Sequence, residues 1–352
     1  MPALRIAWEA TDRICSKRLA PFLPELIPIL EPDKELEVSE AIRAKLLTVS
    51  ASTIDRLLAP FRRRTGRRSP STTRSVSAFK ALIPIRTYAE RKPTEVGCVE
   101  VGLATHCGTS AQGLYLNTLV AVDLVTGWTD CVPVWGKGQS RVGSAIHRVR
   151  PELPLRSLGI NSDNGKFIND PLWEYCQRHD IEFTVARAHR KNDQAHVEHQ
   201  SCRRQGKNWS VVRRLVGYDR YATREAYDQL AYLHRLVRLY VNFFEPMSKL
   251  IGKRREGAKV HKQYDRAQTP YQRLQATEAL SPSQGEGLAA LYGYLNPVQL
   301  RKEIEGALRE LWKMAQPDPR AKAEAAALAK IEASRRQSKK PAKRTREPSS
   351  VG

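Results

Sequence analysis

Two acidic residues in the middle of the chain have a spacing and a context that suit chemistry with metal ions. Asp163 follows a short apolar segment, residues 158–162, and Glu198 lies 35 residues further on in a segment that we expect to be helical. Hard divalent cations prefer carboxylate oxygens. Two such ions, about 3.5–4 Å apart, can activate the attacking and leaving oxygens in phosphoryl transfer. Asp163 and Glu198 are therefore candidate metal ligands and candidate catalytic residues.

The elements that must bring these two acids together alternate between strands and helices. Three apolar segments joined by short glycine-containing turns predict an antiparallel meander over residues 98–104, 114–123 and 128–134. The pattern then predicts a helix at 141–149, a strand at 158–162, a helix from Pro171 to about His179, a strand at 181–185 and a helix that carries Glu198. This order, βββαβαβα, is that of an RNase H-like α/β core with a five-stranded mixed sheet.

Several motifs resemble those of DDE transposases and retroviral-type integrases. The segments 161–165 (NSDNG) and 191–198 (KNDQAHVE) resemble the second and third acidic motifs of that family, and 122–128 (VDLVTGW) resembles its second strand and turn. Residues 207–218 (KNWSVVRRLVGY) are similar to bacterial insertion-sequence transposases with an integrase catalytic domain. The resemblance extends to about Tyr271. It implies DNA integration and transposition of a mobile element by metal-dependent phosphoryl transfer, with Mg²⁺ or Mn²⁺, double-stranded DNA (element ends and target) as partner, and a homo-oligomer.

The chain departs from the family pattern at the first acidic position. The family has an Asp in its first strand where this chain has Gly102, and glycine has no side chain that could bind a metal. Glu100 lies two residues away and therefore on the same face of the strand, so it is a possible substitute. Asp123 is another acid nearby, and we expect its role to be structural.

Two further departures lie close to the same site. The Asp-Asn-Gly motif continues with Lys166, where the family has an acid, and the segment between Glu198 and Lys207 is longer than in the family by roughly seven residues, about two helical turns. These departures predict impaired strand transfer. The alternative is a catalytically inactive DNA-binding protein derived from a transposase, with an end-binding or regulatory role.

The charge of the chain also favours nucleic acid. Lys and Arg number 59 and Asp and Glu 37, which gives a formal net charge of +22. Such a basic excess indicates a polyanionic partner, because neutralised phosphates release counterions. The chain has no Walker phosphate loop, so ATP-driven chemistry is not expected. It also has no apolar run of membrane-spanning length and no secretory signal, so we expect no membrane partner and a location in the bacterial cytoplasm, on the nucleoid.

The first sixty residues favour a helix-turn-helix. Ser39 is expected to cap one short helix, and Ser52 with Asp55 forms a capping signature for a second. The polar residues Thr53 and Arg56 on the second helix are candidates for DNA contact. The alternative is a plain helical bundle.

Two basic or polar segments supply further candidates for DNA contact. Residues 61–92 hold ten basic residues and one acid, and Arg62, Arg63 and Arg64 begin this predicted linker. Lys191, Asn192 and Gln194 precede Glu198 and are expected to position phosphates and bases. The alternatives are a solvated tether and a solvated loop.

We expect five parts in the chain. They are a helical DNA-binding region (1–60), a basic linker (61–92), an RNase H-like catalytic core (93–220), a helical and basic C-terminal region (221–316) and a disordered basic tail (317–352). In the fourth part, Thr223 is expected to cap a helix that ends at Phe244, and further helices are expected at 283–292 and 297–314.

His106, Cys107 and Cys131 are expected to lie in the core and not to form a metal or nucleophile site.

Overall fold

A five-stranded mixed sheet with the strand order β3-β2-β1-β4-β5 forms the centre of the molecule. The computed structural model describes residues 2–61, 95–136, 138–162, 170–185, 208–256 and 259–316. The strands are β1 (Cys98–Thr105), β2 (Leu116–Asp123), β3 (Thr129–Trp135), β4 (Gly159–Ser162) and β5 (Glu182–Val185). β2 pairs antiparallel with β1 and β3, whereas β4 lies parallel to both β1 and β5. This order is that of an RNase H-like core, so the predicted fold class is confirmed.

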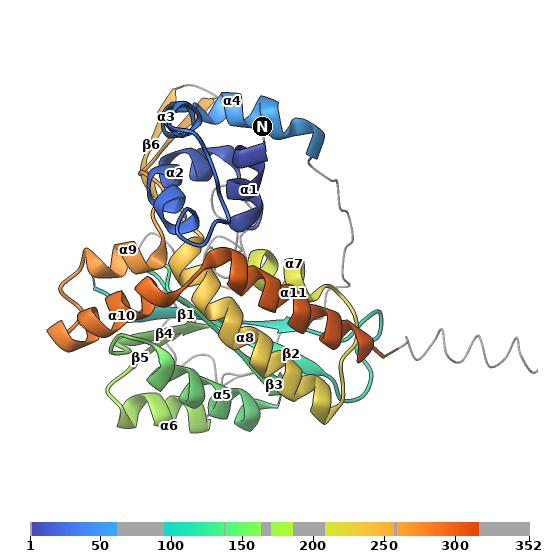
Figure 1. Ribbon diagram of the computed structural model, residues 1–352. Helices are drawn as coiled ribbons and strands as arrows, with labels where there is room; N and C mark the ends of the chain where they lie inside the picture. The colour runs from blue at the N-terminus through green and yellow to red at the C-terminus, as the bar shows by residue number, and fades with distance from the viewer. Residues whose placement is uncertain are drawn as a thin grey trace, which may run out of the picture.

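Helices cover both faces of this sheet (Figure 1). On one side are α5 (Gln139–Glu152) and α6 (Asp170–Arg178), and on the other are α8 (Arg224–Phe244) and α11 (Pro297–Lys313). Every residue of β2 is buried, which explains why its apolar residues 119–122 follow one another and do not alternate with polar residues.

Helix α8 begins and packs as its sequence predicts. The hydroxyl of Thr223 accepts a hydrogen bond from the Ala226 amide at 3.1 Å and so satisfies one free amide of the first turn. The apolar stripe of α8 is buried together with apolar residues of α11 in the same core as the sheet. The stripe consists of Ala226, Leu230, Leu233, Val237, Val241 and Phe244.

The N-terminal residues form a helical module with its own apolar core. Its elements are α1 (Pro2–Ala10), α2 (Ser16–Leu30), α3 (Glu40–Thr48), α4 (Ala51–Leu58) and a 3-10 turn, η1 (Ala59–Phe61). Ile54 and Leu58 of α4 are fully buried in one cluster with apolar residues of α2. α3 and α4 are therefore short helices separated by only two residues and held against α2.

The predicted cap of α4 was wrong by two residues. Ser50, and not Ser52, precedes the helix in an extended conformation, and its hydroxyl accepts a hydrogen bond from the Thr53 amide at 3.2 Å. Ser52 lies inside the first turn, where its own backbone is already helical. Ser39 does precede α3, as predicted, but its side chain makes no capping hydrogen bond.

The C-terminal region is mostly helical, but it contains a hairpin that the sequence did not reveal. The basic segment after α8 forms two antiparallel strands, β6 (Leu250–Glu256) and β7 (Lys259–Tyr264). The remaining elements are a π-helical turn η4 (Asn208–Arg213), α7 (Arg214–Val216), α9 (Pro270–Gln275), α10 (Pro282–Tyr294) and α11. The hairpin was missed because nearly all of its side chains are exposed, so no apolar alternation marks it.

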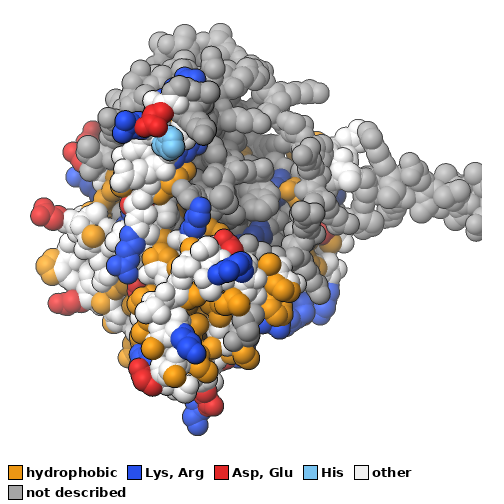
Figure 2. Space-filling model, turned by 90° about the horizontal axis from the view of Figure 1, so that it is seen from above, with side chains coloured by type: hydrophobic (Ala, Val, Ile, Leu, Met, Phe, Trp, Pro, Cys, Tyr) orange, Lys and Arg blue, Asp and Glu red, His pale blue; other side chains and the backbone are white. Residues whose placement is uncertain are grey.

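The predicted basic linker after Phe61 and the predicted basic tail lie outside the described residues. Of the helices that the structure describes, none combines the length and the apolar character needed to cross a bilayer. Seen from above, the described surface carries Lys and Arg side chains with hydrophobic ones between them (Figure 2).

Candidate functional site

The pairing of β1 with β4 at the centre of the sheet involves the residues next to the first two predicted acidic positions. β1 and β4 run parallel, and their register aligns Val101 with Ser162. Gly102 is the residue after Val101, and Asp163 is the residue after Ser162. Asp163 and Glu198 themselves lie outside the described residues.

Glu100 lies two residues before Gly102, deep inside the sheet. It is only 1% exposed, and the register places it between Val122 on β2 and Asn161 on β4. Since alternate residues of a strand face the same side, Glu100 and Gly102 share a face, as predicted. The side chain of Asn161 continues this buried polar row, because its amide donates to the Thr184 hydroxyl on β5 at 2.8 Å.

The described residues do not by themselves form a divalent-metal site at this strand end. Gly102 offers no donor atom, and Glu100 is the one carboxylate of β1. Across the described ranges, no group of three or more His, Cys, Asp or Glu side chains has the arrangement needed to hold a metal ion.

Asp123 is fully used in holding a turn. One carboxylate oxygen accepts from the Gly97 amide at 2.8 Å, and the other accepts from the amides of Val125 and Thr126 and from the Thr126 hydroxyl. Asp123 is also completely buried. The burial and the four hydrogen bonds of Asp123 therefore fit the structural role expected of it.

Two buried histidines share one hydroxyl beside β1 and β2. The Nε2 atom of His106 lies 2.8 Å from the Thr118 hydroxyl, and Nε2 of His234 on α8 lies 3.3 Å from the same oxygen. Burial lowers the pKa of His106 well below its usual value, with Arg213 and His234 adding to the effect, and burial lowers the pKa of His234 to about 3. Both rings are therefore neutral. Cys107 and Cys131 are also buried, as expected of core thiols.

Arg213 of η4 contacts the carboxyl end of β1 at Thr105, which lies three residues after Gly102. Its guanidinium donates to the Thr105 hydroxyl at 3.1 Å and stacks over Tyr218 at 5.1 Å. The sequence did not predict a role for Arg213 at this site, because only the fold brings the segment after residue 207 back to the end of β1. It is a positive charge close to the predicted active-site edge.

Thr53 and Arg56, the predicted DNA-contacting residues of α4, lie on the side of the helix away from its buried residues. Arg56 is exposed and Thr53 is half-buried, whereas Ile54 and Leu58 point into the core of the module. Arg56 donates weakly to the Thr53 hydroxyl at 3.4 Å. The other predicted contacts lie outside the described residues: Arg62, Arg63, Arg64, Lys191, Asn192 and Gln194.

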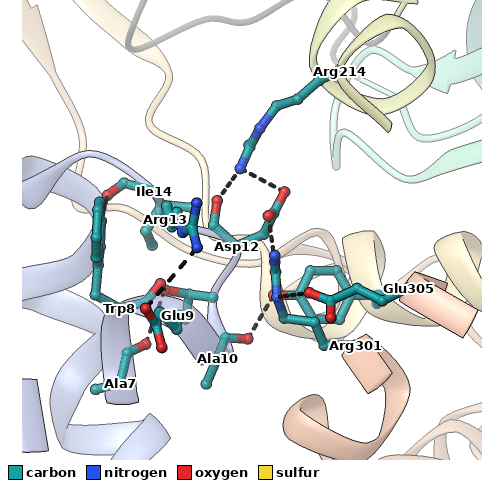
Figure 3. A network of polar contacts seen from close by, with 12 residues as sticks. Ala7, Trp8, Glu9, Ala10, Asp12, Arg13, Ile14, Arg214, Arg301 and Glu305 are labelled. Atoms are coloured by element: carbon teal, nitrogen blue, oxygen red, sulfur yellow. Dashed lines mark hydrogen bonds and ion pairs between the residues drawn. The ribbon is translucent and has the colours of Figure 1, made fainter. Parts of the chain in front are cut away.

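An ion-pair network fixes the N-terminal module on the core (Figure 3). Asp12, which follows α1 and is 6% exposed, binds Arg214 of α7 at 2.6 Å and also pairs with Arg301 of α11. Next to it, the Tyr240 hydroxyl of α8 donates to the Ala10 carbonyl at 2.5 Å. The helix pair α3–α4 therefore has a defined orientation relative to the sheet.

No family model matches the chain. Among solved structures, the catalytic core of HTLV-2 integrase with magnesium aligns over 30% of this chain and 62% of that chain, at 17% identity and a TM-score of 0.23. The simian T-cell lymphotropic virus intasome with PP2A subunit B56 gamma aligns over 47% and 54%, at 13% identity and a TM-score of 0.25, so this chain spans less than two thirds of either. The catalytic core of BIV integrase aligns over 50% and 91%, at 18% identity and a TM-score of 0.28.

The assignment of the fold rests on the strand order and not on these partial overlaps. The sequence relationship is much stronger for a bacterial protein. The uncharacterized protein y4rM of Sinorhizobium fredii is 43% identical over 265 residues, which cover 74% of this chain and 73% of that protein. The chain therefore belongs to the same family as y4rM.

Proposed function

We propose that the chain is a DNA-binding protein of the transposase and integrase class in which metal-dependent strand transfer is impaired. The observation that carries the proposal is the register of β1 and β4, which aligns Val101 with Ser162. The next residue of each strand segment is Gly102 in one case and Asp163 in the other. In a metal-dependent enzyme of this fold, both positions would supply a carboxylate.

The proposed metal ligands are Asp163 and Glu198, with Mg²⁺ or Mn²⁺ as the ion. Carboxylate oxygens suit both ions, but Gly102 contributes no oxygen. Glu100 is 1% exposed beside Asn161, so it would have to leave its buried position to bind an ion at the strand end. We therefore assign no strand-transfer step to the residues present.

The proposed DNA partner is double-stranded, and α4 is the proposed recognition element. The exposed face of α4 carries Arg56, and the helix pair α3–α4 is held on the core by Asp12 and its two arginines. The formal charge of +22 favours the same partner. Element ends and target DNA as ligands, a homo-oligomer and a location on the bacterial nucleoid belong to the same proposal.

The decisive experiment restores the missing carboxylate. Gly102 lies within β1 at a backbone conformation without a positive φ angle, so a side chain can be introduced there without backbone strain. We expect Gly102→Asp to bind Mn²⁺ at least tenfold more tightly than the native chain in calorimetric titration, and to gain strand joining on DNA that carries the element ends.

Gly102→Asn is the matched control, because it has the same shape as Asp but no charge. Equal Mn²⁺ affinity for Gly102→Asp and Gly102→Asn would contradict the proposed metal site. A gain in Mn²⁺ affinity without strand joining would instead indicate that the other departures from the family pattern also block the reaction.

The second candidate function is a catalytically inactive DNA-binding protein with an end-binding or regulatory role. The observation that favours it is the burial of Glu100, which removes the one carboxylate of β1 that could replace the missing Asp. It predicts salt-sensitive binding to element ends by the native chain, with no strand joining at any Mn²⁺ or Mg²⁺ concentration.

A further inference from the structure

The β6–β7 hairpin has two faces of different electrostatic character. On one face, Glu256 forms an ion pair with Arg254 at 3.1 Å and lies 3.6 Å from His261, so a carboxylate accompanies the basic side chains there. The other face carries Lys253 and Lys262, which the strand register places directly opposite each other. Both lysines are exposed.

This arrangement of two lysines is unfavourable for the hairpin itself. Side chains directly opposite on antiparallel strands have Cβ atoms about 4.5–5.5 Å apart, and like charges at that position are destabilising. Burial of apolar side chains stabilises the hairpin little, because its residues Ile251 and Val260 are 61% and 43% exposed. A two-stranded hairpin without a buried face is at best marginally stable in water. A ligand that neutralises the lysines would remove this repulsion.

The base of the hairpin is attached to the helical module that carries α4. Arg18 of α2 donates to the Pro246 carbonyl just before β6, and Arg266 just after β7 donates to the Pro21 carbonyl of α2, each at 3.2 Å. α2 is also the helix on which α4 packs. The hairpin and the proposed recognition helix therefore share one support, and β6 rises toward the same end of the molecule as α3 and α4 (Figure 1).

We propose that the β6–β7 hairpin is an arm that binds the phosphate backbone of double-stranded DNA through Lys253 and Lys262. The inference deepens the proposed function and rests on its DNA-binding part. A two-stranded ribbon has the width to lie in or along the major groove, and phosphates neutralise the paired lysines. Contacts to phosphate position a protein on the duplex without reading its sequence, so the arm adds affinity and orientation while α4 supplies the base contacts.

The test compares the full-length native chain with Lys253→Gln/Lys262→Gln by fluorescence anisotropy on a labelled duplex of mixed sequence, across a series of salt concentrations. The slope of log K against log salt is negative, and each lost phosphate contact reduces its magnitude by about 0.9, so the magnitude is expected to fall by about 2. If the two chains bind equally well at 1 M salt, this difference in slope makes the variant bind about 30-fold more weakly than the native chain at 0.15 M salt. The matched control is Arg309→Gln/Lys313→Gln, which removes two exposed charges from α11 and is expected to leave the slope unchanged.

A second variant separates binding from folding. Lys253→Glu places opposite charges across the hairpin, so its melting temperature is expected to stay equal or rise, while DNA binding falls at least as far as in the double Gln variant. If Lys253→Glu unfolds the chain, or if both variants keep the native slope, the arm proposal is overturned.

Further outcomes distinguish this inference from the proposed function. If the native chain shows no salt-dependent binding to duplex DNA, both proposals fall. If the native chain binds DNA and the double Gln variant binds equally well, only the arm falls. If the double Gln variant keeps its DNA affinity but loses binding to phosphatidylserine vesicles, the lysines serve a lipid surface and the DNA arm is overturned.

Discussion

Asp12 and Arg301 lie 289 residues apart in the sequence and form an ion pair that joins the N-terminal module to the last helix of the described chain. Asp12 has a positive φ of 52°, and it binds Arg214 as well. Burial lowers the pKa of the Arg301 guanidinium, but the charge and hydrogen bond of Asp12, together with Tyr240 and Glu305, outweigh it and raise this pKa on balance. One buried carboxylate therefore connects three parts of the chain that the sequence keeps far apart.

Replacing this carboxylate is expected to loosen the module. Asp12→Asn keeps the shape, and Asn tolerates the left-handed backbone. It removes the counter-charge of Arg214 and one of the two carboxylates that pair with Arg301, which keeps Glu305. We expect the free energy of unfolding in urea to fall by about 2–3 kcal/mol, less than the roughly 3–5 kcal/mol of a fully buried pair because both arginines are partly exposed. Lys302→Gln is the control, since its pair with Glu35 is largely exposed and its loss should change stability by less than about 1 kcal/mol. Equal effects of the two changes would contradict the role of Asp12.

The histidine pair predicts a defined dependence of stability on pH. His106 and His234 have a lowered pKa in the folded chain and an ordinary value near 6.5 when unfolded, so the unfolded state binds more protons below pH 6.5. Their contribution to stability is complete above that pH and is lost as the pH falls toward about 3 for His234. The free energy of unfolding should then fall by about 1.4 kcal/mol per pH unit for each histidine around pH 5.

Urea titrations between pH 7 and pH 4.5 measure this slope. His261→Gln is the control, because that side chain is 61% exposed on the hairpin, and it should leave the slope unchanged. A slope that stays the same after His234→Gln would show that the acid sensitivity has another origin.

Replacing Asp123 tests whether this residue stabilises the turn or binds a metal ion. Asp123→Asn replaces one accepting oxygen by an amide that faces another donor, because both carboxylate oxygens accept hydrogen bonds from the turn. We expect a loss of about 2 kcal/mol in urea unfolding, together with an unchanged Mn²⁺ titration in the Gly102→Asp background. Asp180→Asn, at a site that is 97% exposed, should change stability by less than about 0.5 kcal/mol. A loss of Mn²⁺ binding without a loss of stability would make Asp123 a metal ligand.

The sequence predicts the strands of the sheet well for a physical reason. Strands such as β2 are buried on both faces, so short runs of consecutive apolar residues, here 119–122, identify them. Thr223 was found as a cap because capping depends on neighbouring residues only. The same local logic failed at Ser50 and Ser52, where two hydroxyl residues compete for one cap and the backbone conformation decides between them.

Contacts between distant residues could not be predicted. Nothing near Asp12 in the sequence points to Arg301, and nothing near Thr118 points to His234. The hairpin after α8 was missed because an exposed basic strand has the same composition as a solvated loop. The relation between Gly102 and the end of β4 depends on strand register, which only the assembled sheet provides.

The shared attachment of α4 and the hairpin to α2 has a consequence for the length of any DNA footprint. Two proposed contact elements held on one helix would meet the duplex at a constant separation and a constant angle around its axis. Because the arm contacts phosphates, which every duplex presents at the same spacing, inserting base pairs beside the site of α4 would leave both contacts in place. The proposed footprint would therefore extend a constant length beyond the α4 site, whatever the neighbouring base sequence.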